Sequence, residues 1–326
     1  MNLIDCFDMI IVEAKESMLW ATLSYVWGNS ECREVEERTE RYRAGSRLSS
    51  KIPRTVADAI TVTKKLGFRF LWVDEYCIDQ SDEQHRSSQI TRMDDIYRGG
   101  ELTIVAAAGA NKHHGLPGVS STQRIGSKSI RVGKLTLLSH GCPPSELIQA
   151  SKWFARAWTF QEAILSRRML IFTERQTSFY CTESSWREES RGTVALEAGA
   201  EDLQLKHPRP VPLILAPSKL TFELCWLRMV HLAYSYSQRE MTFEADALNG
   251  FLGVLHDIQR SRPGTYHLSG LPFFRRSDDD TDDDLARIMF TALAWILARE
   301  SQASIEPRRK MFPSWTWVGW GTCISY

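Results

Sequence analysis

Residues 52–74 read IPRTVADAITVTKKLGFRFLWVD, and this stretch decides the class of fold. A proline near its start, apolar residues at helical spacing from Val56 onward, and Gly67 after two lysines predict a helix that ends at the glycine. The next run, 70–74, is apolar up to its last residue and has the length of a strand. A strand without a polar face is typical of a sheet that helices cover on both sides.

The segments on either side repeat this pattern. Residues 19–28, LWATLSYVWG, predict a buried strand that ends in a turn, 83–97 predict a second helix, and 102–108 predict another all-apolar strand. Apolar strands that alternate with helices indicate an α/β fold with a mostly parallel sheet flanked by helices.

The second half of the chain is expected to be mostly helical. Amphipathic stretches predict helices at 220–237, 243–259 and 285–299. A proline-rich bend at 207–212 is the best boundary signal. We therefore expect a first domain over 1–200, with its core at about 19–181. A helical portion over 201–326 follows and closes on the tryptophan-rich run 313–320, which we expect to pack as a strand.

Composition and charge exclude several classes of function. The chain has 326 residues, and its 40 Lys and Arg balance its 40 Asp and Glu, so net charge favours neither nucleic acid nor an anionic membrane surface as a partner. The N-terminus lacks the pattern of a signal peptide, and no apolar run is long enough to span a bilayer. The seven cysteines include no CxxC pair, which is typical of free thiols. We expect a cytoplasmic protein.

The sequence predicts neither a metal site nor a bound cofactor. Six aspartates between 278 and 284 lack the glycine and closing glutamate of a calcium loop, so an acidic loop that precedes a helix is expected. The pair His113–His114 has no second histidine at ligand spacing. Neither of the glycine-rich phosphate-binding motifs GxGxxG and GxxxxGK[ST] occurs.

Ligands of parallel sheets bind beyond the carboxyl ends of the strands. Two aromatic residues follow the first strand, where they can stack on a planar ligand or belong to the core. An aspartate ends the next strand, where it can contact a ligand or cap the following helix. The candidate substrate-binding residues at these two ends are Ser24, Tyr25, Trp27, Asp74, Asp79 and Gln80.

Residues 154–181, FARAWTFQEAILSRRMLIFTERQTSFYC, predict a helix followed by strands at 169–172 and 177–181. A helical repeat of 3.6 residues places three apolar residues on one stripe, which we expect to be buried. These residues are Ala157, Phe160 and Ile164.

Trp158 and Glu162 lie one helical turn apart on another side of this helix. Glu162 can be a carboxylate at a pocket edge that stabilises positive charge or handles a proton. Alternatively, it is a glutamate on the helix surface that pairs with Arg156 or Arg167.

Several segments, in this order, resemble the fungal heterokaryon incompatibility (HET) domain. They are LSYVWG at 23–28, IP at 52–53 with its helix, LWVDEYCIDQ at 71–80, MDDIY at 93–97 and RAWTFQE at 156–162. The resemblance extends from about residue 19 to 181. The later runs 239–248 and 313–317 are similar to segments that often follow such domains.

This resemblance implies a role in fungal allorecognition, in which the domain is a toxic effector that causes growth arrest or cell death. The HET domain is also thought to be distantly related to TIR domains, which have flavodoxin-like sheets. Many TIR domains cleave NAD at the nicotinamide–ribose bond with a glutamate four residues after a tryptophan. Trp158 and Glu162 have this spacing, although Thr159 stands where TIR domains commonly have cysteine.

The resemblance therefore implies NAD as a substrate rather than a cofactor, with Glu162 as the catalytic residue. Trp158 or Tyr25 would stack on a ring, Arg156 would bind a phosphate bidentately, and Asp74 would bind a sugar hydroxyl. The alternative is a non-catalytic signalling module that assembles into a homo-oligomer or binds an allorecognition partner protein. The charged segment 32–48 and the helical portion would supply its surfaces, and both functions can hold together.

Overall fold

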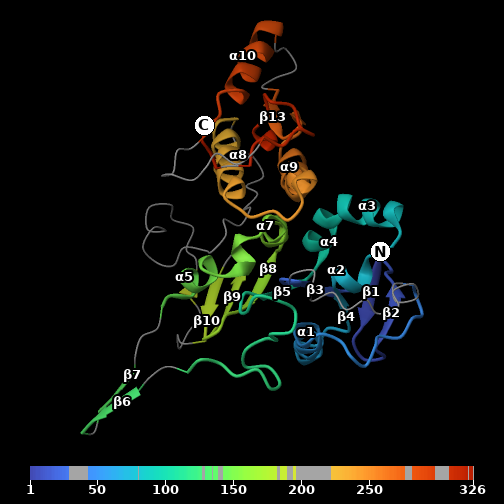
Figure 1. Cartoon of the computed structure of the whole chain (residues 1–326), viewed down its shortest axis with the longest axis vertical. Helices are drawn as coiled ribbons and strands as arrows, with labels where there is room; N and C mark the ends of the chain where they lie inside the picture. The colour runs from blue at the N-terminus through green and yellow to red at the C-terminus, as the bar shows by residue number, and fades with distance from the viewer. Residues whose placement is uncertain are drawn as a thin grey trace. The chain divides into compact units, whose positions relative to one another are not determined.

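The computed structural model describes residues 1–28, 43–79, 81–126, 129–133, 135–138, 142–181, 184–188, 194–195, 222–275, 281–297, 308–321 and 323–325 (Figure 1). The chain divides into two compact units, Met1–Phe154 with Ser166–Leu213, and Ala155–Leu165 with Ile214–Tyr326. In the ranges described, none of the helices combines the length and the apolar character that a membrane span requires. The charged segment 32–48 lies mostly outside these ranges, and the bend at 207–212 lies wholly outside them.

The first unit is built on one sheet of nine strands. Across the sheet they are β11 (Val194–Ala195), β10 (Ser184–Arg187), β9 (Thr177–Cys181), β8 (Arg168–Phe172), β5 (Leu102–Ala106), β3 (Trp20–Ser24), β4 (Phe70–Trp72), β1 (Asn2–Asp5) and β2 (Ile10–Glu13). The four central strands β8, β5, β3 and β4 are parallel, and antiparallel strands extend the sheet on both sides. Numbered along the chain, the parallel strands have the spatial order 2-1-3-4, as in doubly wound flavodoxin-like sheets. The predicted α/β class is confirmed.

Six helices of the described part accompany this sheet. They are α1 (Arg54–Lys65), α2 (Asp74–Cys77), α3 (Glu83–Thr91), α4 (Met93–Gly99), α5 (Pro144–Gln149) and α6 (Lys152–Ala155). The predicted helix at 83–97 is two helices, α3 and α4, which meet at Arg92. The side chains of α3 are mostly exposed, whereas α4 buries an apolar side. Only α4 therefore packs into the core along a whole side.

Helices pack on both faces of the parallel strands (Figure 1). α1 buries the predicted apolar residues, among them Val56 and Ile60. On the opposite face the ring of Tyr97 from α4 meets the Trp72 ring edge-on, with centroids 5.4 Å apart, and its hydroxyl donates to the Leu23 carbonyl at 3.2 Å. Coverage from both faces explains why β3 and β5 have almost no exposed side chain.

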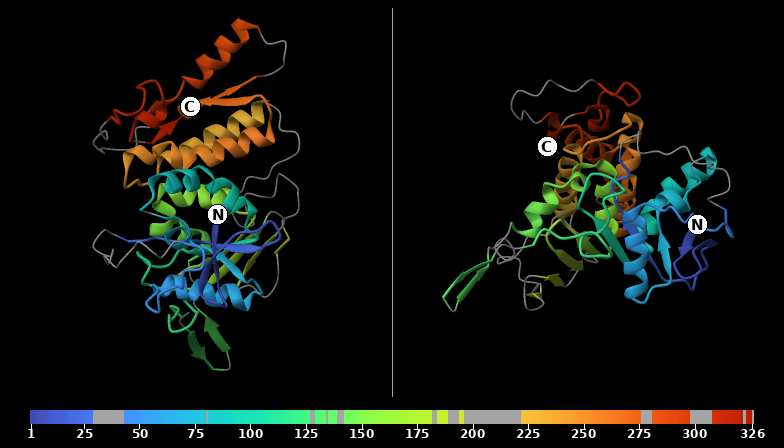
Figure 2. Two further views of the ribbon diagram at one scale, coloured as in Figure 1. Left: turned by 90° about the vertical axis from the view of Figure 1, so that its right-hand side faces the viewer. Right: turned by 60° about the horizontal axis from the view of Figure 1, so that its bottom comes forward.

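The second unit holds α7 (Ala157–Leu165), α8 (Phe222–Ser237), η2 (Glu244–Ala247), α9 (Asn249–Ser261), β12 (Thr265–Leu268), β13 (Leu271–Phe274), α10 (Asp282–Ala292), β14 (Ile296–Leu297), η3 (Trp317–Gly319) and β15 (Ile324–Ser325). α8 and α9 lie side by side, as Figure 2 shows. The helical prediction holds for α8, α9 and α10. α10 begins earlier than predicted because Thr281 and Asp284 form a capping box. It also ends earlier, at Ala292, and the helix predicted up to 299 is wrong at Ile296–Leu297, which form β14. The chain enters this unit at Ala155 and leaves it at Ser166, so α7 belongs to it.

The tryptophan-rich run is a short 3-10 helix, η3, and the predicted strand there is wrong. The Thr316 side chain accepts a hydrogen bond from the Val318 N–H and so caps the turn. The prediction that this run packs is right for Trp317, which is 2% exposed. Its ring lies edge-on to Phe251 at 5.3 Å and to Tyr236 at 6.1 Å.

Candidate functional site

The carboxyl ends of β3 and β4 bring three of the predicted site residues together. Tyr25 and Trp27 follow β3, and Asp74 is the first residue of α2, directly after β4. The Trp27 indole N–H donates to Asp74 Oδ2 at 3.0 Å, and the Tyr25 hydroxyl donates to Glu75 Oε2 at 2.9 Å. Adjacent parallel strands end at the same edge of a sheet, which is why residues about fifty positions apart meet here.

Two further residues complete this group, and the sequence reasoning missed both. Lys112 Nζ lies 2.5 Å from Glu75 Oε1, and the two side chains are only 13% and 20% exposed. Glu75 could have been found because it follows Asp74 directly. Lys112 could not, because it comes from the long loop after β5. We call Tyr25, Trp27, Asp74, Glu75 and Lys112 the sheet-edge group.

Electrostatics keep the phenol of Tyr25 neutral. The side chain is 4% exposed, and burial, together with the negative charges of Asp74 and Glu75, raises the pKa of Tyr25 well above its usual value. A neutral phenol is a hydrogen-bond donor, and here it donates to a carboxylate that Lys112 also contacts. The group is therefore preorganised, with its main polar atoms already positioned by one another.

The alternative in which Asp74 caps α2 is not what the structure has. Val73 is the N-cap residue and makes no side-chain cap. Asp74 Oδ1 instead accepts a hydrogen bond from the next backbone N–H, that of Glu75, at 2.7 Å. Asp74 thus lies within the first turn of α2, and its carboxylate accepts hydrogen bonds both from this turn and from the Trp27 indole.

The remaining predicted residues of the first unit have separate surroundings. Ser24 is 1% exposed, and its hydroxyl accepts a hydrogen bond from the Trp153 indole at 2.6 Å. Asp79 lies in the turn before α3 and accepts from the backbone and the hydroxyl of Ser81. Burial alone would raise the pKa of Asp79, but the hydrogen bonds from Ser81 lower it below its usual value. Gln80 lies outside the described residues.

Glu162 is on α7 in the second unit and is 5% exposed, so it is not a residue of the helix surface. The predicted apolar stripe is confirmed as buried, but so is nearly every other position of α7. Trp158 alone on this helix is half-buried. Of the two arginines considered as partners, Arg167 lies 3.6 Å from Glu101.

Residues 239–253 hold α7 from several directions, and we call them the clamp segment. The Trp158 indole donates to Asp246 Oδ2 at 3.3 Å, and Gln161 Oε1 accepts from the backbone N–H of Gly253 at 2.7 Å. The Arg239 guanidinium lies over the Phe160 ring at 4.7 Å. The Arg156 carbonyl accepts from Arg239 Nη1 at 3.3 Å, and the Ala157 N–H donates to the Glu240 carbonyl at 2.9 Å. Five of the residues in RAWTFQE are therefore tied to one later segment.

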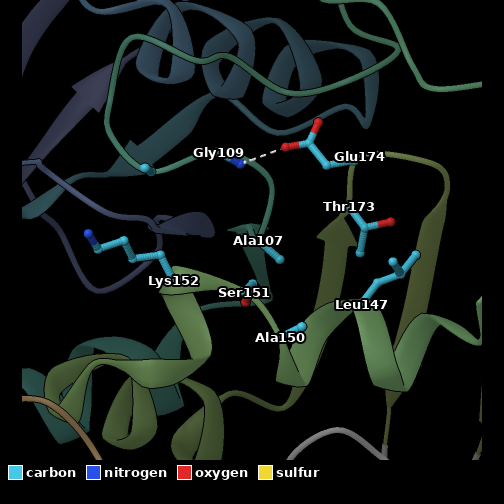
Figure 3. A pocket seen from close by; sticks show the side chains of 9 residues that line it. Ala107, Gly109, Leu147, Ala150, Ser151, Lys152, Thr173 and Glu174 are labelled. Atoms are coloured by element: carbon cyan, nitrogen blue, oxygen red, sulfur yellow. Dashed lines mark hydrogen bonds between the residues drawn. The ribbon is translucent and has the colours of Figure 1, made fainter.

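A hollow of about 320 Å³ lies elsewhere in the first unit, beside the ends of β5 and β8 (Figure 3). Its polar lining includes Lys152 and Glu174, and the Glu174 carboxylate accepts a hydrogen bond from the Gly109 N–H at 3.0 Å. No predicted site residue lines it. Three separate segments form its walls, so no single sequence motif could have revealed it.

The comparisons with known proteins give one match. Residues 20–162 match the family model described as heterokaryon incompatibility protein (HET). Residues 20–162 are a HET domain. The HET domain supports a role related to heterokaryon incompatibility, as the resemblance implied. No curated protein and no solved structure matches the chain. The HET match contains every predicted site residue and ends on Glu162, whereas the clamp segment lies beyond it.

Proposed function

We propose that this chain is an allorecognition effector that causes growth arrest or cell death by cleaving NAD, with Glu162 as the catalytic residue. The observation that carries the proposal is the burial of this carboxylate, 5% exposed, one turn after Trp158 at the end of the HET match. Removing a carboxylate from water costs free energy, and such groups concentrate at functional sites.

The reaction needs only a carboxylate and water. The bond between the ribose C1′ and the nicotinamide nitrogen breaks, and its electron pair leaves with nicotinamide. Glu162 stabilises the positive charge that develops on the ribose, as carboxylates do in glycoside hydrolysis. Water then adds to C1′ and loses a proton, which gives ADP-ribose. Arg156 and Trp158, which belong to the same unit as Glu162, are the proposed substrate-binding residues beside it.

The test compares the wild-type chain with Glu162→Gln, which keeps the side-chain shape and removes the charge. NAD loss and nicotinamide release are measured by chromatography over a range of protein concentrations, because self-assembly can be needed for activity. We expect cleavage to fall by about 100-fold or more. Glu83→Gln, at an exposed position of α3, is the matched control and should retain the wild-type rate.

Equal NAD consumption by wild type and Glu162→Gln would contradict the catalytic proposal. If cell death also persisted with Glu162→Gln, the chain would act as the non-catalytic signalling module instead. Thermal unfolding of both variants, recorded beside the activity, separates loss of chemistry from loss of fold.

A further inference from the structure

We propose that the hollow beside β5 and β8 binds a sugar phosphate of about pentose size. The inference is independent of Glu162, because the hollow lies wholly within the first unit and Glu162 belongs to the second. It also adds residues that neither the sequence reasoning nor the HET match singles out as a site.

The position is one where parallel sheets bind ligands. β5 ends at Ala106 and β8 at Phe172, and these two strands are parallel neighbours. The residues that follow them, Ala107 and Thr173, line the hollow. The strand order reverses at the neighbouring pair β3 and β5, so the hollow lies one strand away from the switch point of the doubly wound sheet.

The size and the walls restrict the occupant. A volume of about 320 Å³ is at the lower end for ligand pockets, which suits one sugar phosphate rather than a dinucleotide. Small residues such as Ala107, Gly109 and Ala150 make up much of the wall, so a ligand can approach the backbone. Gly109 has a φ of +76°, and a Cβ there would collide with the ring of His114, so this wall requires glycine.

Glu174 supplies fixed acceptors for hydroxyl groups. One carboxylate oxygen accepts from the Gly109 N–H at 3.0 Å, and the other lies 3.3 Å from His114 Nε2. The side chain is still 39% exposed, so lone pairs remain available to a ligand. An ionised carboxylate only accepts hydrogen bonds, so Glu174 suits the hydroxyl groups of a sugar.

Lys152 supplies the cation for a phosphate. It lines the hollow at another side from Glu174, and its side chain is exposed. In the view of Figure 3 this side chain extends away from the other labelled residues, so its flexible stem has to turn inward for the ammonium to meet a phosphate. Among the described residues none forms an ion pair with it. A lysine ammonium binds phosphate as a point charge. A cation on one side and hydroxyl acceptors on another match a ligand with a phosphate at one end and hydroxyls at the other.

The two hydroxyl side chains of the lining hold the walls in place. Ser151 Oγ donates to the Ile148 carbonyl at 2.6 Å, and Thr173 Oγ1 donates to the Gln176 carbonyl at 2.8 Å. Recognition therefore rests on Lys152 and Glu174. An α-amino acid also carries two opposite charges, and alanine in the experiment below tests it as the competing ligand.

The experiment measures binding of ribose 5-phosphate, ADP-ribose, inorganic phosphate and alanine to the full chain by titration calorimetry. Lys152→Ala should weaken all three phosphate ligands by about tenfold or more. Glu174→Gln should weaken ribose 5-phosphate and should not weaken inorganic phosphate, because only the sugar ligand is long enough to reach Glu174 with hydroxyls while its phosphate meets Lys152. Lys65→Ala and Glu83→Gln, both at exposed positions, are the matched controls.

The pattern of ligands then identifies the source of the sugar phosphate. Tighter binding of ADP-ribose than of ribose 5-phosphate indicates a nucleotide fragment, and equal or weaker binding indicates the free sugar phosphate. No binding of ribose 5-phosphate at about 10 mM overturns the proposal. Binding of ribose 5-phosphate that Lys152→Ala leaves unchanged also overturns it. So does a result in which Glu174→Gln changes the binding of alanine but not that of ribose 5-phosphate.

Discussion

The sheet-edge group and α7 are both built from aromatic and acidic residues of the HET domain, yet the two are held in different ways. At the sheet edge the partners are side chains, such as Tyr25 on Glu75, and most of them are partly exposed. On α7 the partners include backbone groups and aromatic rings, and the helix is buried almost all round. A ligand can therefore compete for the bonds of the sheet edge, whereas α7 is held within the core of the second unit.

The largest effect should come from Phe160→Ala. This ring is fully buried, and it lies 5.6 Å from the Tyr236 ring and 6.3 Å from the Phe251 ring. Its loss should lower the free energy of unfolding by about 3–5 kcal/mol because it leaves a cavity in the core. Urea unfolding followed by circular dichroism measures this.

The control for that variant is Phe290→Ala on α10, where the ring is 74% exposed. It should change the free energy of unfolding by less than about 0.5 kcal/mol. If the two substitutions cost the same, α7 is not part of the core, and the contrast with the sheet edge fails.

Gln161→Leu should have an intermediate effect. It removes the acceptor of the Gly253 N–H and leaves that buried donor without its partner, which should cost about 1–3 kcal/mol. The same unfolding experiment applies, with Gln238→Leu at an exposed position as control. If Gln161→Leu lowered the free energy of unfolding no more than Gln238→Leu does, the hydrogen bond between Gln161 and Gly253 would not contribute to stability.

Tyr25→Phe should have the smallest effect, about 0.5–1.5 kcal/mol, because Glu75 keeps its ion pair with Lys112. The raised pKa of Tyr25 keeps its phenol neutral in the folded protein, so the difference should not vary below about pH 10. Above that pH the unfolded phenol ionises first, and the wild type should lose stability relative to the variant. If Tyr25→Phe lowered the free energy of unfolding more than Gln161→Leu does, the hydrogen bond of the sheet-edge group would contribute more to stability than the one on α7. That result would contradict the comparison of the two regions.

Local pattern predicted well wherever the structure depends on neighbours in the sequence. The run 70–74 has no polar face, which indicated a strand covered on both sides, and β4 is one. The meeting of Tyr25 and Trp27 with the residues after β4 follows from the rule that parallel strands end at the same edge. The strands β10 and β11 were not predicted, because their segment is polar and pairs at the edge of the sheet.

The sequence by itself determined the α/β class, the match of residues 20–162 to the HET family model and the carboxyl edge at which candidate residues gather. Only the tertiary structure decided that α7 belongs to the second unit, that Lys112 joins the sheet-edge group, and that Lys152 and Glu174 flank one hollow. The physical reason is the separation in sequence between residues that come into contact. Hydrophobic periodicity records which side of an element is buried, but the choice of a partner up to 129 residues away depends on how whole surfaces fit.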